Sequence, residues 1–209
     1  NLSECKRIVD IVRFAVNPSK INKLQDFLIV TKKLGFVVAL NIMYSHTILK
    51  NQKVLKKILE LKKYFNILYI VDSYGTLISG DVKNIVNKIK TIDKKILIGF
   101  HSHNNLELAL SNSIEAIDNG VNYLDSTFTG IGRGAGNLRT ELLLTYLSLK
   151  KNILKIKNFK NIGKVVDKFE EMKLKENWGT SLPYMISGST QSPQSQTMQL
   201  IKSKRYNMS

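Results

Sequence analysis

Two of the three histidines in this chain lie one residue apart, in the stretch GFHSHNN at residues 99–105. Successive side chains of a strand point to opposite faces, so His101 and His103 would project to the same face. They follow an apolar run and precede a helical pattern, which places them at the carboxyl end of a strand, where catalytic groups of parallel α/β proteins gather. Because neutral imidazole is a good ligand for divalent metals, this spacing predicts a metal site. A hydrogen-bonded pair of ordinary histidines is the alternative interpretation.

A glycine-rich loop, TGIGRGAGN at residues 129–137, follows the next strand pattern. Its glycines allow positive φ angles and a close approach of the backbone to a ligand. The amide oxygen of Asn137 could add a hard ligand to the two histidines. Two simpler interpretations stay open: the loop is a flexible linker, or Asn137 is the N-cap of the following helix.

Further polar residues at the strand ends are candidate catalytic groups, namely Arg13, Ser45 and Asp72 on the first three strands. An arginine at such a position can hold a substrate carboxylate through two parallel hydrogen bonds. Asp125 reaches the same rim from the fifth strand, and His46 is a weaker candidate for contacting the substrate or supporting its neighbours. Each of these residues could equally be structural, because charged residues at strand ends also cap loops and orient other side chains.

The elements that must position these residues form five repeats of a strand followed by a helix. Short β-branched runs predict strands within residues 8–16, 36–45, 67–73, 96–103 and 121–128. Helical periodicity of apolar residues follows each of them, most clearly after residue 105. This alternation predicts an α/β fold with a parallel sheet buried on both faces, either an open doubly wound sheet or part of a closed barrel. The glycine loop comes too late in the chain for a dinucleotide-binding turn and lacks the acidic residue of that fingerprint.

Composition narrows the class of protein. The chain has 209 residues, fewer than the roughly 250 of a complete eight-stranded α/β barrel. Its net charge of +16 comes mostly from lysines spread over nearly every predicted helix, which indicates a solvated surface that favours anionic substrates rather than a nucleic-acid site. No apolar run is long enough to span a bilayer, and a single cysteine, Cys5, suits a reducing compartment. We therefore expect a cytoplasmic protein without membrane or nucleic-acid partners.

The regular alternation ends near residue 150. The sequence predicts one more helix, carrying Ile162 and Phe169 on its apolar side, followed by a polar tail that contains Pro183 and Pro193. We expect two parts, a partial barrel over residues 1–150 and a C-terminal helix and tail over residues 151–209. The second part would pack outside the core or serve in assembly, as a homo-oligomer or through another association of this region.

The most specific resemblance to a known family lies in two segments, GFHSHNNLELALSNSIEAIDNG and LDSTFTGIGRGAGNLRTELLL. They resemble the last two barrel units of the metal-dependent aldolases and acyl-transferring lyases related to hydroxymethylglutaryl-CoA lyase. Weaker similarity through VDSYGTL, MYSH and VRFAV looks like the aldolase branch, closest to proteins of the 4-hydroxy-2-oxovalerate aldolase type. The resemblance implies a TIM barrel and a divalent ion, manganese or magnesium. It also implies that His101, His103 and an aspartate of the first barrel strand bind this ion, with Asn137 completing the site in several members.

The resemblance also implies which part of the barrel this chain corresponds to. The five units would correspond to strands four to eight, the C-terminal part only, and the first three units, with their Arg-Asp pair, would be absent. A barrel that lacks three strands would expose two long sheet edges, which parallel sheets tolerate poorly. The chain could be a fragment, could be completed by a second polypeptide, or could come from a decayed gene. The start without a methionine favours the fragment.

The function implied is that of a metal-dependent carbon–carbon lyase. Such an aldolase would act on a 2-oxo acid and an aldehyde, in the aldol or retro-aldol direction through a pyruvate enolate, and would be inactive without the missing units. One alternative is an acyl-CoA condensing synthase or lyase of the same superfamily. Another is a non-catalytic barrel remnant that binds anionic partners.

Overall fold

The computed structural model describes residues 2–149, 156 and 159–203. The chain divides into two compact units. The first unit comprises Asn1–Ser73, Ser79–Phe100 and Glu115–Leu124, and the second comprises Tyr74–Ile78, His101–Ile114 and Asp125–Ser209. The domain boundary predicted at residues 150–151 lies outside the described residues.

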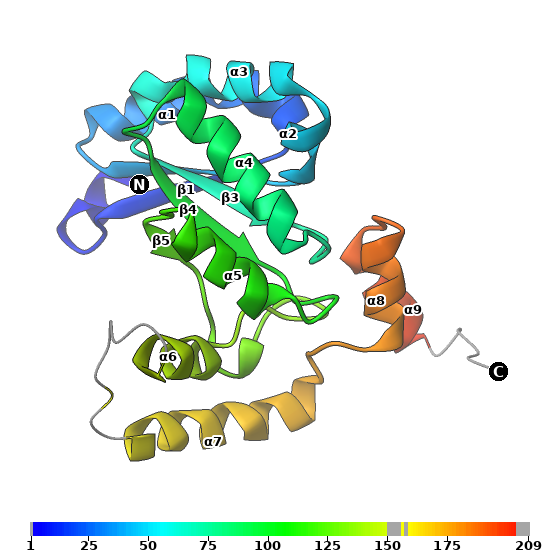
Figure 1. The fold of residues 1–209 in the computed structure, drawn as a ribbon. Coiled ribbons are helices and arrows are strands. Elements are labelled where there is room, and N and C mark those ends of the chain that lie inside the picture. Colours follow the sequence, from blue (N-terminus) through cyan, green and yellow to red (C-terminus); the bar gives the residue numbers. More distant parts are fainter. Residues whose placement is uncertain (1, 150–155, 157–158, 204–209) are drawn as a thin grey trace. The chain divides into compact units, whose positions relative to one another are not determined.

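Five strands form one parallel sheet with the order β1-β2-β3-β4-β5 (Figure 1). Their bounds are Ile11–Val16 for β1, Val37–Ile42 for β2, Ile67–Asp72 for β3, Leu97–Ser102 for β4 and Tyr123–Leu124 for β5. The prediction of five strand–helix units is therefore confirmed. A doubly wound sheet reverses its strand order at a switch point, whereas these strands follow one another in sequence. The order is that of a partial barrel.

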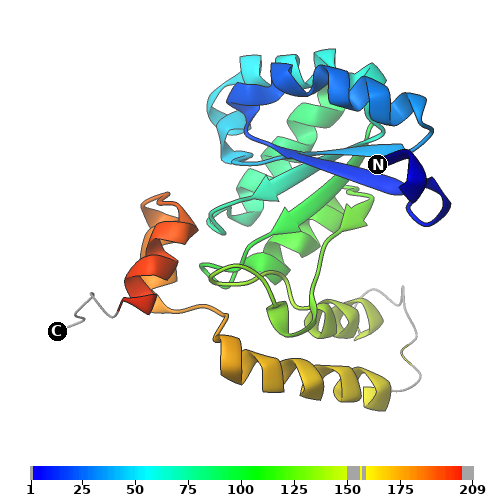
Figure 2. The same cartoon turned by 180° about the vertical axis from the view of Figure 1, so that it is seen from behind.

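Helices cover only one face of this sheet. The covering elements are η2 (Pro18–Leu24), α1 (Gln25–Lys33), α2 (His46–Lys50), α3 (Gln52–Glu60) and α4 (Ser79–Ile92), with the short turns η1 (Leu2–Arg7) and η3 (Lys62–Tyr64). The apolar stripe predicted for α4 is confirmed, since Val82, Ile85 and Ile89 are fully buried, but Ile92 at its end is exposed. These helices lie along the sheet (Figure 1, Figure 2), and Leu40 and Ile70 on the strands are buried.

The other face of the sheet is partly exposed. It carries Arg13, Asn41 and Tyr69, which the parallel register brings to the same side of β1, β2 and β3. On this face Ile11 and Leu97 are more than a third exposed, whereas Ala39 and Ile67 are buried. In a closed barrel such inward-facing side chains fill the interior, so their exposure is consistent with an incomplete barrel.

The second unit is built from loops and helices. Its elements are the first part of α5 (Ala109–Asp118), η4 (Phe128–Gly130), α6 (Thr140–Leu149), α7 (Phe159–Glu176), α8 (Leu182–Ser189) and α9 (Gln194–Lys202). The helix predicted after residue 150 is confirmed as α7. Two more helices occur where the sequence indicated only a polar tail. No helix in the described part of the chain is long and apolar enough to span a bilayer.

Prolines explain why this tail is helical. Pro183 occupies the first turn of α8 and Pro193 precedes the first residue of α9. Proline is favoured at helix starts, where its missing N–H would have no intrahelical partner and its fixed φ suits the helix. The two prolines therefore mark where α8 and α9 begin. The helices lie side by side, in orange and red in Figure 2.

The packing face of α5 includes a polar residue. Asn112 is buried and its amide donates to the carbonyl oxygen of Leu77. Ala109 and Ser113 are buried beside it. The helix thus packs through small and hydrogen-bonded residues, which a count of apolar positions does not reveal.

Candidate active site

The two histidine rings lie side by side in the second unit. His101 is the last residue but one of β4, at the carboxyl end of the strand, and His103 follows two residues later. Their ring centroids are 5.2 Å apart, with an angle of 70° between the planes. The strand therefore holds two imidazoles next to each other without a flexible linker, as their alternate positions require.

Asp125 orients the first of these rings. Its Oδ2 lies 2.9 Å from Nδ1 of His101, and both side chains are largely shielded from solvent. A carboxylate accepts a hydrogen bond from an imidazole N–H, so neutral His101 carries its proton on Nδ1 and its lone pair on Nε2. Metal-binding histidines commonly have this arrangement, in which an outer carboxylate fixes the ring and raises its basicity. The sequence placed Asp125 at the rim but did not identify it as the partner of His101.

The second ring has an amide partner from the C-terminal helices. Nε2 of Gln194, the first residue of α9, lies 3.0 Å from Nδ1 of His103 and 3.0 Å from Oδ1 of Asn105. Nδ2 of Asn105 donates in turn to the carbonyl oxygen of Tyr184 on α8, at 2.9 Å. The sequence analysis did not single out Asn105 or Gln194. Asn105 could have been noticed, because it lies next to the histidines in HSHNN.

The glycine-rich loop runs beside the histidines. Asn137 forms an antiparallel bridge with His103, and its Nδ2 donates to the carbonyl oxygen of Ile131 at 3.0 Å. Backbone hydrogen bonds also join Gly136 to Asn104 and Leu138 to Ser102. These contacts argue against a flexible linker. Asn137 is not the N-cap of α6 either, because that helix begins three residues later, at Thr140.

One glycine of this loop is required by the C-terminal helices. Gly134 has a φ of 63°, and a Cβ atom there would lie 2.5 Å from Oε1 of Gln194 and 3.0 Å from the ring of Tyr184. Such separations are well inside van der Waals contact. The glycine therefore permits the close approach of α8 and α9 to the loop.

The donor set matches part of a ligand set for a divalent ion. In the described residues no three histidine, cysteine, aspartate or glutamate side chains converge on one point. The two imidazoles lie together, the backbone of Asn137 pairs with that of His103, and Asp125 orients the ring of His101. Nδ1 of His103 lies 3.0 Å from Nε2 of Gln194, which leaves Nε2 of this ring as the nitrogen that could bind a metal.

Arg13, a predicted carboxylate-binding residue, lies in the first unit on the partly exposed face of the sheet. The centre of its guanidinium is 4.0 Å from the centroid of the Tyr69 ring, and its Nε donates to Oδ1 of Asn41 at 3.3 Å. Stacking on an aromatic face fixes the plane of a guanidinium while its remaining N–H groups can meet a carboxylate.

Ser45 and Asp72, the other predicted catalytic residues, are also in the first unit and are buried. Oγ of Ser45 donates to the carbonyl oxygen of Ile42 at 2.7 Å and accepts from the N–H of Val71 at 2.9 Å, so it joins β2 to β3. Asp72 is only 3% exposed and shares its parity on β3 with Ile70, on the face that the helices cover. Both placements are compatible with structural roles, and a catalytic role for either residue stays a prediction.

His46, the weaker candidate, is the first residue of α2, and its ring meets that of Tyr44 edge to face at 6.4 Å. Burial, and to a smaller extent the charge of Lys50, lowers the pKa of the His46 imidazole below its ordinary value of 6.5. The folded chain thus takes up this proton less readily than the unfolded chain. Its contribution to stability is present above pH ~6.5 and is lost as the pH falls through the folded pKa.

We therefore expect a His46→Gln variant to lose less stability than the parent chain between pH 7.5 and 5.5. Urea unfolding at both pH values measures the difference, and a Lys50→Gln variant serves as the matched comparison because it removes only the smaller cause. An equal pH dependence in the His46→Gln and parent chains would contradict the lowered pKa.

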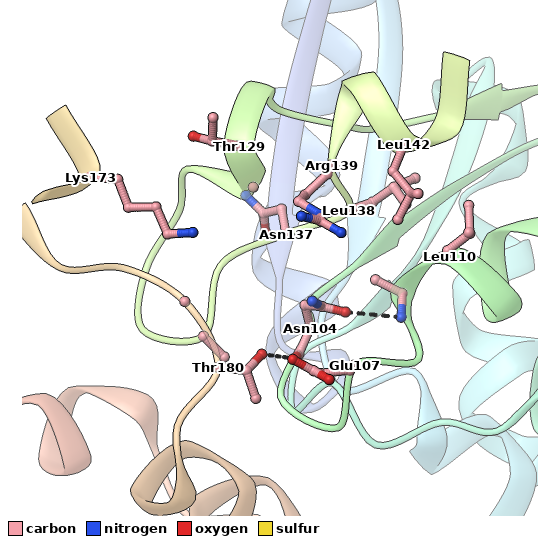
Figure 3. A pocket seen from close by; sticks show the side chains of 14 residues that line it. Asn104, Glu107, Leu110, Thr129, Asn137, Leu138, Arg139, Leu142, Lys173 and Thr180 are labelled. Atoms are coloured by element: carbon pink, nitrogen blue, oxygen red, sulfur yellow. Dashed lines mark hydrogen bonds between the residues drawn. The ribbon is translucent and has the colours of Figure 1, made fainter. Parts of the chain in front are cut away.

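A pocket of about 270 Å³ lies in the second unit, between the glycine loop, the start of α5, α6 and the end of α7, and Asn137 is among its lining residues (Figure 3). Arg139 and Lys173 line it from different elements, with Glu107 on another wall. Each cation has only a distant acidic partner, at 4.0 Å. Leu110, Leu138 and Leu142 supply an apolar side (Figure 3). The pocket combines a net positive lining with an apolar wall.

Comparison with known proteins decides the family. Residues 11–168 match the model of the HMGL-like family, which covers most of the chain. The chain belongs to the HMGL-like family. Among curated HMGL-like relatives, the 4-hydroxy-2-oxovalerate aldolase of Geobacillus genomosp. 3 is 35% identical over 141 residues, or 67% of this chain and 41% of the relative. The oxaloacetate decarboxylase of Mycobacterium tuberculosis is 39% identical over 87 residues, or 42% of this chain and 26% of the relative.

Solved structures agree with the family. The N-terminal domain of a putative aldolase from Bacteroides vulgatus superimposes with a TM-score of 0.87 at 38% identity, covering 94% of this chain and 65% of that one. The carboxyl transferase domain of Rhizobium etli pyruvate carboxylase, solved with pyruvate and biocytin, gives a TM-score of 0.76 at 15% identity, over 98% of this chain and 36% of that one. The second likeness is one of fold alone.

These comparisons change one expectation. The chain spans less than half the length of the curated aldolases that it matches. The matched solved structure is an N-terminal domain, so the expected correspondence to the C-terminal part only, and to barrel strands four to eight, is not supported. The partial barrel itself stands.

Proposed function

We propose that this chain is part of a divalent-metal-dependent aldolase that makes or breaks a carbon–carbon bond of a 2-oxo acid. The pairing of His101 with Asp125, beside His103, carries the proposal, because it is the arrangement of a metal-binding histidine. Membership of the HMGL-like family and identity of about a third to several 4-hydroxy-2-oxovalerate aldolases support it. Activity depends on the barrel being completed by a longer protein or by a second chain.

The residues of this chain would divide the work. His101, His103 and Asn137 would hold a manganese or magnesium ion, and Asp125 would keep the ring of His101 in place. When bound, such an ion acts as a Lewis acid that polarises the keto oxygen of a 2-oxo acid. In the first unit, Arg13, stacked on Tyr69, is a separate candidate for binding a carboxylate.

Substrate assays of a protein in which this chain is part of a complete barrel test this proposal. With manganese present, we expect turnover of pyruvate with short aldehydes, and of the corresponding 4-hydroxy-2-oxo acids in the reverse direction. Parallel assays offer 2-oxo acids with acetyl-CoA, the substrates of the acyl-CoA condensing branch. Turnover of the second set alone would reject the aldolase in favour of that branch.

A second candidate function is binding of a small carboxylate without catalysis. The pocket between Arg139 and Lys173 favours it, since two cations from different elements face a cavity with an apolar wall. A short aliphatic 2-oxo acid would place its carboxylate near the cations and its chain against the leucines.

For this pocket we expect Arg139→Gln and Lys173→Gln each to weaken binding of 2-oxohexanoate by about fivefold, the worth of one partly exposed charge. Shifts of the backbone amides in NMR titrations measure the affinity. Lys168→Gln is the matched control, because Lys168 is exposed on α7 and does not line the pocket. Equal losses in all three variants would indicate attraction by net charge only and would dismiss the pocket.

A further inference from the structure

A second pocket, of about 350 Å³, lies wholly within the first unit. It is bounded by the residues that follow β1, by η2, by α2 and by the first turns of α3. Small-molecule sites in proteins have volumes of roughly 300–1,000 Å³, so the space is sufficient for a small ligand. We call it the α3 pocket, because α3 supplies its charged side chains.

The charged side chains of the α3 pocket are both cations. Lys53 and Lys57 are four residues apart on α3, so they share one face of the helix. Neither has an ion-pair partner within the described part of the chain, and none of the described residues that line the pocket is acidic. The pocket of the second unit differs in this respect, because Glu107 lines it. The α3 pocket therefore favours an anion.

Two asparagines that line the pocket have side-chain N–H groups to spare. Oδ1 of Asn17 lies 3.0 Å from the backbone nitrogen of Ser19, and Oδ1 of Asn51 lies 2.9 Å from that of Lys53. A backbone N–H can only donate, so both atoms must be amide oxygens, and each Nδ2 is left without a partner among the described residues. The N–H groups of Lys53 and Val54 are both bonded to Asn51. Side chains, and not the end of the helix, thus supply the free donors.

Apolar side chains form another part of the lining. Ile21 is 2% exposed, and Pro18 and Val54 line the pocket with it. Such a surface can bind a short carbon chain, whereas ammonium and amide N–H groups bind an anionic group. A phosphate monoester combines both parts, and it carries up to two negative charges and three strong acceptor oxygens on a single group. A carboxylate offers fewer acceptors to the same number of donors.

We propose that the α3 pocket binds a small phosphate monoester. The two lysines and the two asparagine amides hold the phosphate, and the carbon skeleton of the ligand lies against the apolar lining. This binding site is additional to the proposed aldolase function, since none of its residues belongs to the candidate metal site.

An NMR titration of the full chain with n-propyl phosphate tests this proposal through the shifts of the backbone amides. We expect the largest shifts within residues 17–22 and 47–57, and a higher affinity than for inorganic phosphate, which lacks the carbon chain. Succinate, whose two charges lie on separate groups, should bind more weakly than n-propyl phosphate. Equal affinities for succinate and n-propyl phosphate, or no shifts within these residues, would overturn the proposal.

Three variants each remove one unit of positive charge from the pocket. Lys53→Gln and Lys57→Gln should each weaken the binding of n-propyl phosphate about fivefold, as expected for one partly exposed charge. Asn51→Asp keeps an oxygen that can cap α3 but replaces the free N–H groups with a second acceptor, so it should weaken binding at least as much.

Lys56→Gln is the matched control, because Lys56 is exposed on the same helix and does not line the pocket. It should leave the affinity for n-propyl phosphate nearly unchanged. The chain has a net charge of +16, so attraction without a site would weaken equally in all four variants. That result would overturn the proposal.

Vesicles that contain phosphatidic acid present the same phosphate monoester on a membrane surface. We expect Lys53→Gln and Lys56→Gln to reduce sedimentation of the chain with these vesicles equally, because the pocket would not take part. A larger reduction for Lys53→Gln, together with no amide shifts from n-propyl phosphate, would assign the lysines to a membrane surface and reject the small ligand.

Discussion

Replacing His101 and His103 together with alanine should abolish measurable binding of Mn²⁺ by this chain. The two rings are the adjacent imidazoles of the candidate site, and no cluster of three histidine, cysteine or acidic side chains that could replace them occurs in the described residues. Isothermal titration calorimetry measures the affinity. The third histidine supplies the matched control, because His46 lies in the first unit and its replacement by alanine should leave the affinity unchanged.

Asp125 refines this prediction. Asp125→Asn keeps the shape of the side chain but weakens its acceptor, and we expect the affinity for Mn²⁺ to fall about 10–100-fold. Retained affinity in the double histidine variant would place the metal elsewhere and remove the basis of the proposed function. Retained affinity in Asp125→Asn alone would mean that the carboxylate does not orient a ligand.

The largest loss of stability should follow from Gly136→Ala. Gly136 has a φ of 77°, and a Cβ atom there would lie 2.3 Å from the carbonyl oxygen of Gly130. That oxygen accepts the N–H of Asn137 at 3.0 Å, so it cannot move aside without breaking a hydrogen bond of the loop. The left-handed backbone and the clash together should lower the free energy of unfolding by about 2–4 kcal/mol.

Gly163→Ala is the matched control for urea unfolding of this variant. Gly163 lies inside α7, its φ is not in the left-handed region, and nothing lies within 4 Å of an added Cβ atom. Alanine there should raise the free energy of unfolding by up to about 1 kcal/mol through helix propensity. Destabilisation of similar size in both variants would show that the loop does not depend on the conformation of Gly136.

Much of the fold could be predicted because its signals are local. Each strand of the sheet is a short β-branched run, and each following helix carries a periodic stripe, as in Val82, Ile85 and Ile89 of α4. The signals for the starts of α8 and α9 are also local, but the sequence predicted only a polar tail around Pro183 and Pro193. Proline is favoured in the first turn of a helix and interrupts a helix when it lies further inside. The polar residues around Pro183 and Pro193 did not show which of the two positions each proline occupies.

The candidate site was predictable only where alternation along a strand decides the geometry. The side-by-side rings of His101 and His103 follow from their spacing. The face of Asp72 could not be read in this way, because β3 is buried on both sides and shows no alternation of polar and apolar residues.

The sequence by itself determined the βα order, the adjacency of the two histidines and the glycines that let the loop lie close to them. Only the tertiary structure decided the partners of those histidines. Gln194 lies 91 residues after His103 in the chain, and Asp125 lies 24 residues after His101. A hydrogen bond depends on distances of a few tenths of an ångström between atoms that the folded chain brings together, and no periodicity of residue types encodes these. For that reason the spacing of the rings could be predicted from HSHNN, whereas the hydrogen-bond partner of each ring could not.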